Sequence, residues 1–269
     1  MTGPYLNGRH VGVAWLTGAM ALLVVLVSTA ADAAENSTNN NDWQFKVQAY
    51  GWLPTIEGTL PTGNDIEFTI DEIFDNLDMT FMGVFQARRD KWAIVSDVVY
   101  LKLSSDEAGN TTIPIGPLNV PTRVDIGVEM KTLIVNLAGS YRVYQTDKFD
   151  VQLLAGVRYF SLDTEAELDT SIVPAGGTEV DADDDVWDGI VGIRGLANLS
   201  DKWWLTYRFD AGAGGSDLTW NAVAQVGRRY DWGSVAAGYR YLHYDFDSDF
   251  KLLKDLDVYG PFIGAAWEF

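Results

Sequence analysis

The sequence of 269 residues contains no cysteine, which excludes disulfide bonds and metal sites built on cysteine sulfur. Basic residues are scarce: 19 Lys and Arg stand against 38 Asp and Glu, which gives a net charge of −19 at pH 7. Because a nucleic-acid-binding protein needs a basic face for the phosphates, we expect no nucleic acid partner. Histidine is also rare, and His243 is the only histidine after residue 33.

Long apolar runs are missing as well, except at residues 11–27. This run follows a short basic region at Arg9 and precedes a small-residue site at Ala31 and Ala33, an order that predicts a secretory signal peptide over 1–33, cleaved after Ala33. A membrane anchor is the alternative, since about 17 apolar residues are at the short limit for spanning. No later stretch approaches the length of a membrane helix, about 18 apolar residues. The polar residues 34–42 are predicted to be a disordered leader.

Residues 43–269 alternate between apolar and polar or small residues, which is the period of a β-strand with two unlike faces. We predict ten strands in one barrel domain, each about as long as a tilted strand needs to cross a bilayer, about 9 to 11 residues. The predicted strands are 43–53, 78–88, 92–103, 124–144, 149–162, 186–198, 202–213, 218–230, 234–246 and about 256–269.

The predicted connections alternate in length. Short turns occupy 89–91, 145–148, 199–201 and 231–233, whereas 57–77, 104–123, 163–185 and 247–255 are longer and polar, with 214–217 as the one short member of that second set. Short turns on one side and longer loops on the other are typical of a bacterial outer-membrane barrel. An even strand number puts both chain ends on the periplasmic side. Eight or twelve strands are the alternatives, because 57–77 and 104–123 have room for another hairpin.

Tryptophans decide between this barrel and a soluble β-sandwich. They cluster at strand ends near the short turns, where a membrane barrel has its interfacial girdle: Trp92, Trp203, Trp204, Trp232 and Trp267. In a soluble sandwich the same residues would form an exposed apolar patch that needs its own explanation. The sequence therefore predicts an all-β fold, a transmembrane antiparallel up-and-down barrel in the outer membrane.

The chain ends GPFIGAAWEF, and four of its residues share one apolar face: Ile263, Ala265, Trp267 and Phe269. A terminal phenylalanine preceded by alternating apolar residues resembles the C-terminal signal of Gram-negative outer-membrane proteins. The resemblance covers residues 43–269. It implies that these four residues are both the lipid face of the last strand and the signal that the barrel-assembly machinery recognises.

A narrower resemblance involves seven short segments: GWLPTIEGT (51–59), FDNLDMTFMGVFQAR (74–88), AGVRYF (155–160), GIRG (192–195), GGSDLTW (214–220), YRYL (239–242) and GPFIG (260–264). They are similar to a set of uncharacterised proteobacterial outer-membrane β-barrel proteins. This similarity implies a fold and a location but no activity. We expect no cofactor, and we expect outer-membrane lipid and lipopolysaccharide as partners.

Four arginines lie well inside predicted strands. Arg208 alternates with Tyr207 and Phe209, whose aromatic side chains suit lipid, so Arg208 is predicted to face the lumen. An arginine pointing outward at the middle of a bilayer would cost about 2–4 kcal/mol. A turn centred near Asp201 would place Arg194 almost opposite Arg208. The candidate lumen residues are Arg158, Arg194, Arg208, Asp210 and Arg240.

These arginines need anionic partners, and four acidic residues fall on phases that we expect to point inward: Asp97, Glu129, Asp188 and Asp210. Two interpretations remain open. The arginines form an anion-attracting constriction of a narrow pore, or they form a salt-bridged plug inside a narrow barrel. The predicted function is accordingly a narrow pore, or a barrier and scaffold barrel with a charged lumen.

Acidic residues gather in 179–188, where Asp181, Asp183 and Asp185 are candidates for a divalent-ion loop. Val186 stands where an EF-hand loop needs glycine, so the alternative is a solvated, self-repelling loop. A surface module that binds a ligand or divalent ion through its acidic outer loops is therefore a second hypothesis. No residue is assigned as a confident metal ligand.

A catalytic interpretation rests on His243, which lies two residues from Asp245 on one strand face. Outer-membrane omptin proteases and lipid A deacylases use histidine at such places, but this chain has neither family's motif beyond an isolated His-x-Asp. Since a catalytic histidine needs a positioned partner, we assign no catalytic residue and expect no enzyme. An outer-membrane hydrolase is the third hypothesis.

Overall fold

The computed structural model describes residues 42–115, 118–170 and 178–269. The expected signal peptide (1–33) and nearly all of the expected leader (34–42) lie outside these residues. No helix in the described part of the chain has the length and apolar character needed to cross a membrane.

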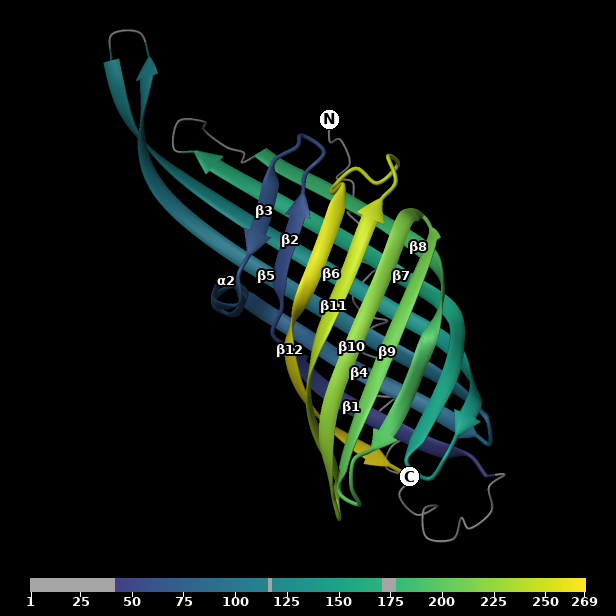
Figure 1. Ribbon diagram of the computed structural model, residues 1–269. Coiled ribbons are helices and arrows are strands. Elements are labelled where there is room, and N and C mark those ends of the chain that lie inside the picture. The colour runs from purple at the N-terminus through teal and green to yellow at the C-terminus, as the bar shows by residue number, and fades with distance from the viewer. Residues whose placement is uncertain (1–41, 116–117, 171–177) are drawn as a thin grey trace, which may run out of the picture. The chain divides into compact units, whose positions relative to one another are not determined.

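Ten antiparallel strands close into a barrel, which confirms the predicted fold class and strand number (Figure 1). Around the wall they are β1 (Gln44–Trp52), β4 (Leu77–Arg89), β5 (Trp92–Ile115), β6 (Leu118–Gln145), β7 (Phe149–Thr170), β8 (Thr178–Asn198), β9 (Trp203–Gly214), β10 (Ser216–Tyr230), β11 (Gly233–Phe246) and β12 (Asp255–Glu268). The first and last of these strands pair with each other, with Lys46 opposite Glu268 and Trp52 opposite Phe262. This pairing closes the wall.

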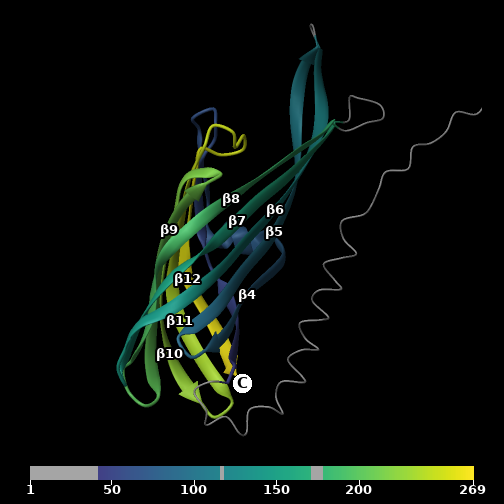
Figure 2. The same ribbon diagram turned by 90° about the vertical axis from the view of Figure 1, so that its right-hand side faces the viewer.

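The four strands β5–β8 extend far beyond the rest of the wall (Figure 2). The β5–β6 pairing continues to Ile115 opposite Leu118, and the β7–β8 pairing continues to Leu168 opposite Thr178. The segments 104–123 and 163–185, which we expected to be loops, are therefore mostly strand. Their polar sequence misled the prediction, because pairing with a neighbouring strand satisfies the backbone groups of a strand whether or not its side chains are apolar.

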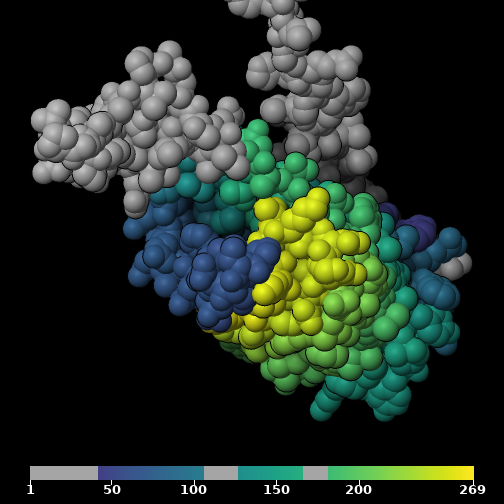
Figure 3. All heavy atoms as spheres, turned by 90° about the horizontal axis from the view of Figure 1, so that it is seen from above, coloured from purple at the N-terminus to yellow at the C-terminus, as the bar shows by residue number. Residues whose placement is uncertain are grey.

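The expected loop 57–77 contains three further elements: β2 (Thr55–Thr59), β3 (Asp65–Phe68) and α2 (Ile70–Asp75). Pro54 separates β1 from β2, and β2 then follows the outer half of β12, with Thr59 opposite Asp255. Seen from above, the blue atoms of β2 and β3 lie against the yellow atoms of the last part of the chain (Figure 3). The hairpin therefore continues the wall beside β12 where the pairing of β1 with β12 ends.

Helix α2 lies where the wall is incomplete. The pairing between β1 and β4 ends at Ala49 opposite Gly83, so the remainder of β4 is paired with β5 alone among the described strands. The helix begins with a capping box in which Thr69 and Glu72 exchange hydrogen bonds. Its Ile73 is buried with apolar residues of β5, which covers the inner side of this seam.

The outer surface carries an apolar band. Its exposed members come from strands all around the wall: Phe81, Phe85, Ile94, Leu137, Leu153, Val157, Val191, Ile193, Phe209, Val226 and Ile263. Aromatic pairs flank the band at the short-turn end (Trp92–Tyr141, Trp232–Trp267) and again further along the strands (Tyr159–Trp187, Trp220–Tyr241). An apolar band between two aromatic girdles on a closed sheet is the surface of a transmembrane β-barrel.

Candidate functional site

The interior of the barrel is filled at mid-height by a layer of hydrogen-bonded polar side chains, and Arg158 on β7 is at its centre. Arg158 is 0% exposed. Its Nε donates to Asn136 Oδ1 at 2.7 Å, its Nη1 donates to Thr219 Oγ1 at 2.6 Å, and its Nη2 pairs with Asp210 Oδ1. Because these partners belong to β6, β10 and β9, the side chain reaches across the lumen rather than along one wall.

Arg240 on β11 makes the second crossing. Its Nη1 lies 3.0 Å from Asp97 Oδ2 on β5 and donates to the Tyr50 hydroxyl on β1 at 3.1 Å. Tyr50 in turn donates to Asp97 Oδ1 at 2.8 Å, and the guanidinium lies 4.9 Å from the centroid of a Trp52 ring. The arginine is 3% exposed. Two arginines from β7 and β11 thus hold partners on strands that are not their neighbours.

The other two candidate arginines lie directly opposite each other, Arg194 on β8 and Arg208 on β9. The Arg208 Nε donates to Asp210 Oδ2 at 2.6 Å, so this carboxylate pairs with two guanidiniums at once. The Arg194 Nη2 donates to the amide oxygen of Gln86 on β4 at 2.5 Å. All five residues of the candidate lumen set therefore point inward and belong to one connected region.

The expected inward position of Glu129 is wrong. Its neighbour Met130 packs against the interior apolar clusters, so Glu129 faces outward. There it accepts from Lys102 at 2.8 Å and from Lys131 at 2.7 Å. Beyond the apolar band a strand can carry charge on its outer face, and charge there no longer indicates the lumen side.

An apolar layer closes the lumen on the long-hairpin side of the arginines. It is formed by inward residues of several strands together with the loop 247–254, which folds over them: the loop's Phe250 and Leu253 are 5% and 4% exposed. Phe250 stacks on Phe246 with ring centroids 4.1 Å apart. The backbone N–H of Lys251 donates to Asp184 on β8 at 2.7 Å, which fixes the loop across the mouth.

The same loop begins with a local turn around Asp247. This carboxylate accepts from the Ser248 hydroxyl at 2.9 Å and from the Asp249 backbone N–H at 3.3 Å. These hydrogen bonds, that of Ser248 foremost, lower the pKa of Asp247 below its ordinary value. The turn is therefore built on an ionised carboxylate.

Side chains also occupy the short-turn end of the lumen. Trp204 points inward from β9 and is 2% exposed, with Lys46 Nζ 5.0 Å from the centroid of its ring. Above it, the Gln48 amide on β1 donates to Gln225 on β10 at 3.2 Å. Side chains therefore occupy the lumen in three successive levels along its length.

The candidate divalent-ion residues lie on a strand rather than in a loop. Asp181, Asp183 and Asp185 alternate along β8, and Asp183 is opposite Asp163 while Asp181 is opposite Glu165. Among the side chains that the structure describes, no group of three His, Asp or Glu could hold a metal ion. The row is spread along the strand, as expected for a solvated acidic face.

His243 lies on the outer face of β11, beside the aromatic girdle. Its Nδ1 is 2.8 Å from Asp257 Oδ1 on β12, and its ring is 5.8 Å from that of Trp220. The partner is therefore the cross-strand Asp257, not the Asp245 that the sequence suggested. A hydrogen-bonded pair at the edge of the apolar band fits an interfacial residue.

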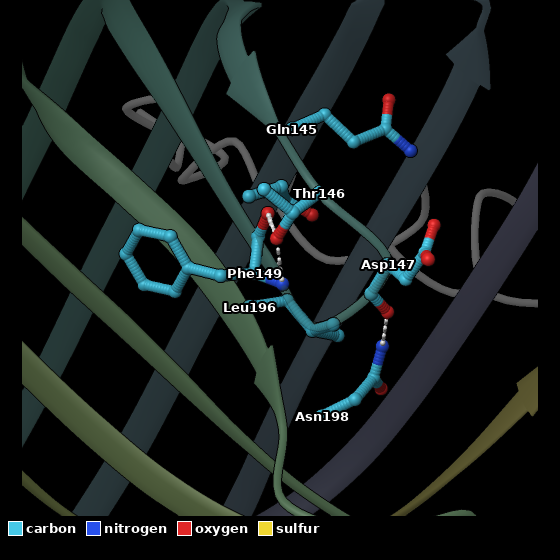
Figure 4. A pocket seen from close by; sticks show the side chains of 7 residues that line it. Gln145, Thr146, Asp147, Phe149, Leu196 and Asn198 are labelled. Carbon is cyan, nitrogen blue, oxygen red and sulfur yellow. Dashed lines mark hydrogen bonds between the residues drawn. The ribbon is translucent and has the colours of Figure 1, made fainter.

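A shallow pocket lies at the β6–β7 turn, lined by Gln145, Thr146, Asp147, Phe149, Asp150, Leu196 and Asn198 (Figure 4). Its polar groups hold the turn together: the Phe149 N–H donates to Thr146 Oγ1 at 3.0 Å, and the Asn198 amide donates to the Asp147 carbonyl at 3.3 Å. These groups are already used by the turn, so the pocket is a feature of the connection rather than of the interior site.

Comparisons with known proteins give distant structural likenesses and no sequence match. No protein-family model matches the sequence, and no curated protein matches it. The chain is similar to the translocator domain of the autotransporter NalP from Neisseria meningitidis, with 12% identity and a TM-score of 0.45, covering 94% of this chain and 97% of that one. It is also similar to Ail, the attachment invasion locus protein of Yersinia pestis, with 8% identity and a TM-score of 0.35, covering 85% of this chain and 99% of that one. A third similar structure is the Ralstonia pickettii toluene transporter TbuX, with 13% identity and a TM-score of 0.37, covering 85% of this chain and 72% of that one.

These likenesses are distant and concern architecture alone. The membrane location rests on this chain's own surface, where the apolar band and the two girdles lie on a closed barrel. A barrel of this kind is an outer-membrane protein.

Sequence reasoning missed the neutral members of the polar layer, above all Asn136, Asn221 and Thr219, which are 1%, 1% and 0% exposed. The sequence did contain a signal for the two asparagines, namely their phase on the strands. Strands of a transmembrane barrel alternate apolar residues outside with polar residues inside, so an asparagine in phase with an inward arginine predicts a lumen hydrogen bond. The packing of Phe250 into the mouth had no such signal, because a loop residue has no strand phase.

Proposed function

We propose that this protein is a closed barrel of the Gram-negative outer membrane, a barrier and scaffold protein rather than an open pore, with both ends of the barrel domain on the periplasmic side. The observation that carries the proposal is the complete burial of Arg158, whose three donor groups hold partners on β6, β9 and β10. An ion could pass this level only if those hydrogen bonds were broken. Each hydrogen bond to a charged group contributes about 1.5–3 kcal/mol.

Two further observations support a closed lumen. The apolar layer under loop 247–254 would have to part before water could enter from the long-hairpin side. Trp204 and Lys46 occupy the opposite end. A pathway for solutes therefore requires changes at both the arginine layer and the apolar layer, which favours the plug over the constriction among the two interpretations of the arginine set.

The proposal extends to biogenesis and surroundings. Ile263 and Trp267 are 59% and 41% exposed on the outward face of β12, which supports their role, with Ala265 and Phe269, as the signal for the barrel-assembly machinery. The resemblance to uncharacterised proteobacterial outer-membrane β-barrel proteins belongs to the same proposal. Lipopolysaccharide and lipid are the proposed neighbours, no catalytic step is part of the function, and the acidic outer strands are its exposed surface.

The test is solute entry into liposomes that contain the refolded barrel. We expect no swelling in small neutral or charged solutes for the natural protein. The double variant Arg158→Gly/Arg240→Gly, which removes both crossings, should admit the smallest solutes. The control is Arg228→Gly, which removes one arginine that points outward over Trp203 and Tyr230 and leaves both crossings in place. Swelling with the natural protein would refute the closed barrel.

A further inference from the structure

The ion pairs of the polar layer leave one arginine without a close carboxylate partner. Arg240 and Asp97 lie 3.0 Å apart, and Arg158 and Arg208 both pair with Asp210. Arg194 makes no ion pair among the described residues, and its Nη2 donates to the neutral amide of Gln86. A buried charge without a close counterion is costly in a protein interior.

Two positively charged side chains lie side by side in this layer. Arg194 and Arg208 are cross-strand partners on the inward face, so their Cβ atoms are about 4.5–5.5 Å apart. Like charges directly opposite each other destabilise a sheet. In addition, Arg208 Nη2 is buried and has no hydrogen-bond partner among the described residues. One side of this guanidinium therefore lacks the acceptor that its geometry requires.

None of the inward carboxylates completes the hydrogen bonding of Arg208. Asp210 accepts from the Arg208 Nε and also from the Asn221 amide at 3.1 Å, and Asp150, toward the turn, accepts from the Gln152 amide at 2.8 Å. Asp188 has a buried Oδ2 without a partner among the described residues, but it lies opposite Arg158, six residues from Arg194 along β8. An acceptor from outside the chain can complete the hydrogen bonding of Arg208.

The location is polar and reachable. Arg208 keeps 15% of its side chain exposed and Arg194 is partly exposed, whereas Arg158 one level above is 0% exposed. The site is thus on the short-turn side of the plug, where Gln86 also lines the lumen. A guanidinium presents a planar fork of donors that matches an oxyanion with two hydrogen bonds.

We propose that Arg194 and Arg208 together bind one small inorganic oxyanion of the phosphate type, with the free Arg208 Nη2 and the Arg194 guanidinium as donors. The anion offsets the repulsion between the two guanidiniums and completes the hydrogen bonding of Arg208. The site is separate from the question whether the lumen conducts, because it lies on one side of the Arg158 level.

The experiment is a phosphate titration of the refolded full barrel in zwitterionic detergent, at constant ionic strength balanced with sodium chloride. We expect calorimetry to show one saturable site and the midpoint of thermal unfolding to rise with the logarithm of phosphate concentration. Arg194→Gln and Arg208→Gln should each lower the affinity at least tenfold. Arg228→Gln, with the same charge change on the outer face, should leave it unchanged.

Two further variants keep the proposal falsifiable if a glutamine variant fails to fold. Arg194→Lys keeps the charge but loses the fork, so it should weaken phosphate binding while the barrel stays folded, as shown by its heat-modifiable migration. Gln86→Leu keeps both arginines and should retain the site. The proposal would be overturned if phosphate neither bound nor raised the midpoint of thermal unfolding of the natural protein. It would also be overturned if phosphate acted equally on the natural protein, Arg194→Lys and Arg228→Gln.

Discussion

Replacement of Arg158 by leucine tests the polar layer most sharply, because this side chain is fully buried and holds partners on three strands. The change removes a fully buried cation and leaves Asn136 Oδ1 and Thr219 Oγ1 without their donor. Asp210 keeps Arg208 and Asn221 but loses one of its two ion pairs. Removal of one partner from a buried ion pair typically costs about 3–5 kcal/mol, and we expect Arg158→Leu to lower the free energy of unfolding by that amount.

The assay is urea unfolding of the barrel in lipid vesicles, followed by tryptophan fluorescence. The double variant Arg158→Leu/Asp210→Asn should be less destabilised than the sum of the single variants, with a coupling of about 1–3 kcal/mol. The outward Arg228→Leu, which loses only exposed cation–π contacts, should cost less than about 1 kcal/mol. Additive single effects, or a cost for Arg158→Leu no larger than the control, would refute the account of a connected polar layer.

Three further outcomes are expected. Gly227→Ala should destabilise the barrel by about 1–3 kcal/mol in the same urea assay, because the added methyl group would overlap the Trp204 indole. Phe250→Ala removes a side chain buried in the mouth and should cost about 3–5 kcal/mol, with earlier protease cleavage in the loop 247–254 as a second readout. Thr69→Ala breaks the capping box with Glu72 and should weaken α2 by about 1 kcal/mol, measured as faster amide hydrogen exchange in the helix while the strands stay protected.

The barrel itself was predictable because the features that indicate it lie within short stretches of the sequence. Alternation with period two, the even strand number and the alternation of short turns with long connections all follow from the linear sequence, and the structure contains ten barrel strands. The pairing of Arg194 with Arg208 was also accessible, since counting outward from a short turn fixes which residues lie opposite each other.

Other features depend on contacts between distant segments. The polar stretches beyond the apolar band read as loops, but they continue the β5–β6 and β7–β8 ladders, where pairing with the neighbouring strand supplies the hydrogen bonds. The alternation of apolar and polar residues is also lost near Glu129, so the sequence placed this residue on the inner face, whereas it lies on the outer face and pairs with Lys102. The partner of His243 was missed because Asp257 belongs to the next strand, and only the register of β11 with β12 brings them together.

The central claim is that the lumen is closed by the crossings of Arg158 and Arg240 and by the layers on either side. Single-channel recording of the refolded barrel in a planar bilayer at neutral pH, with anion and cation selectivity measured, tests it most directly. The account predicts a silent bilayer when a correctly folded, heat-modifiable barrel is present. Steady, selective openings of the natural protein would contradict it and would make the arginines a constriction instead of a plug.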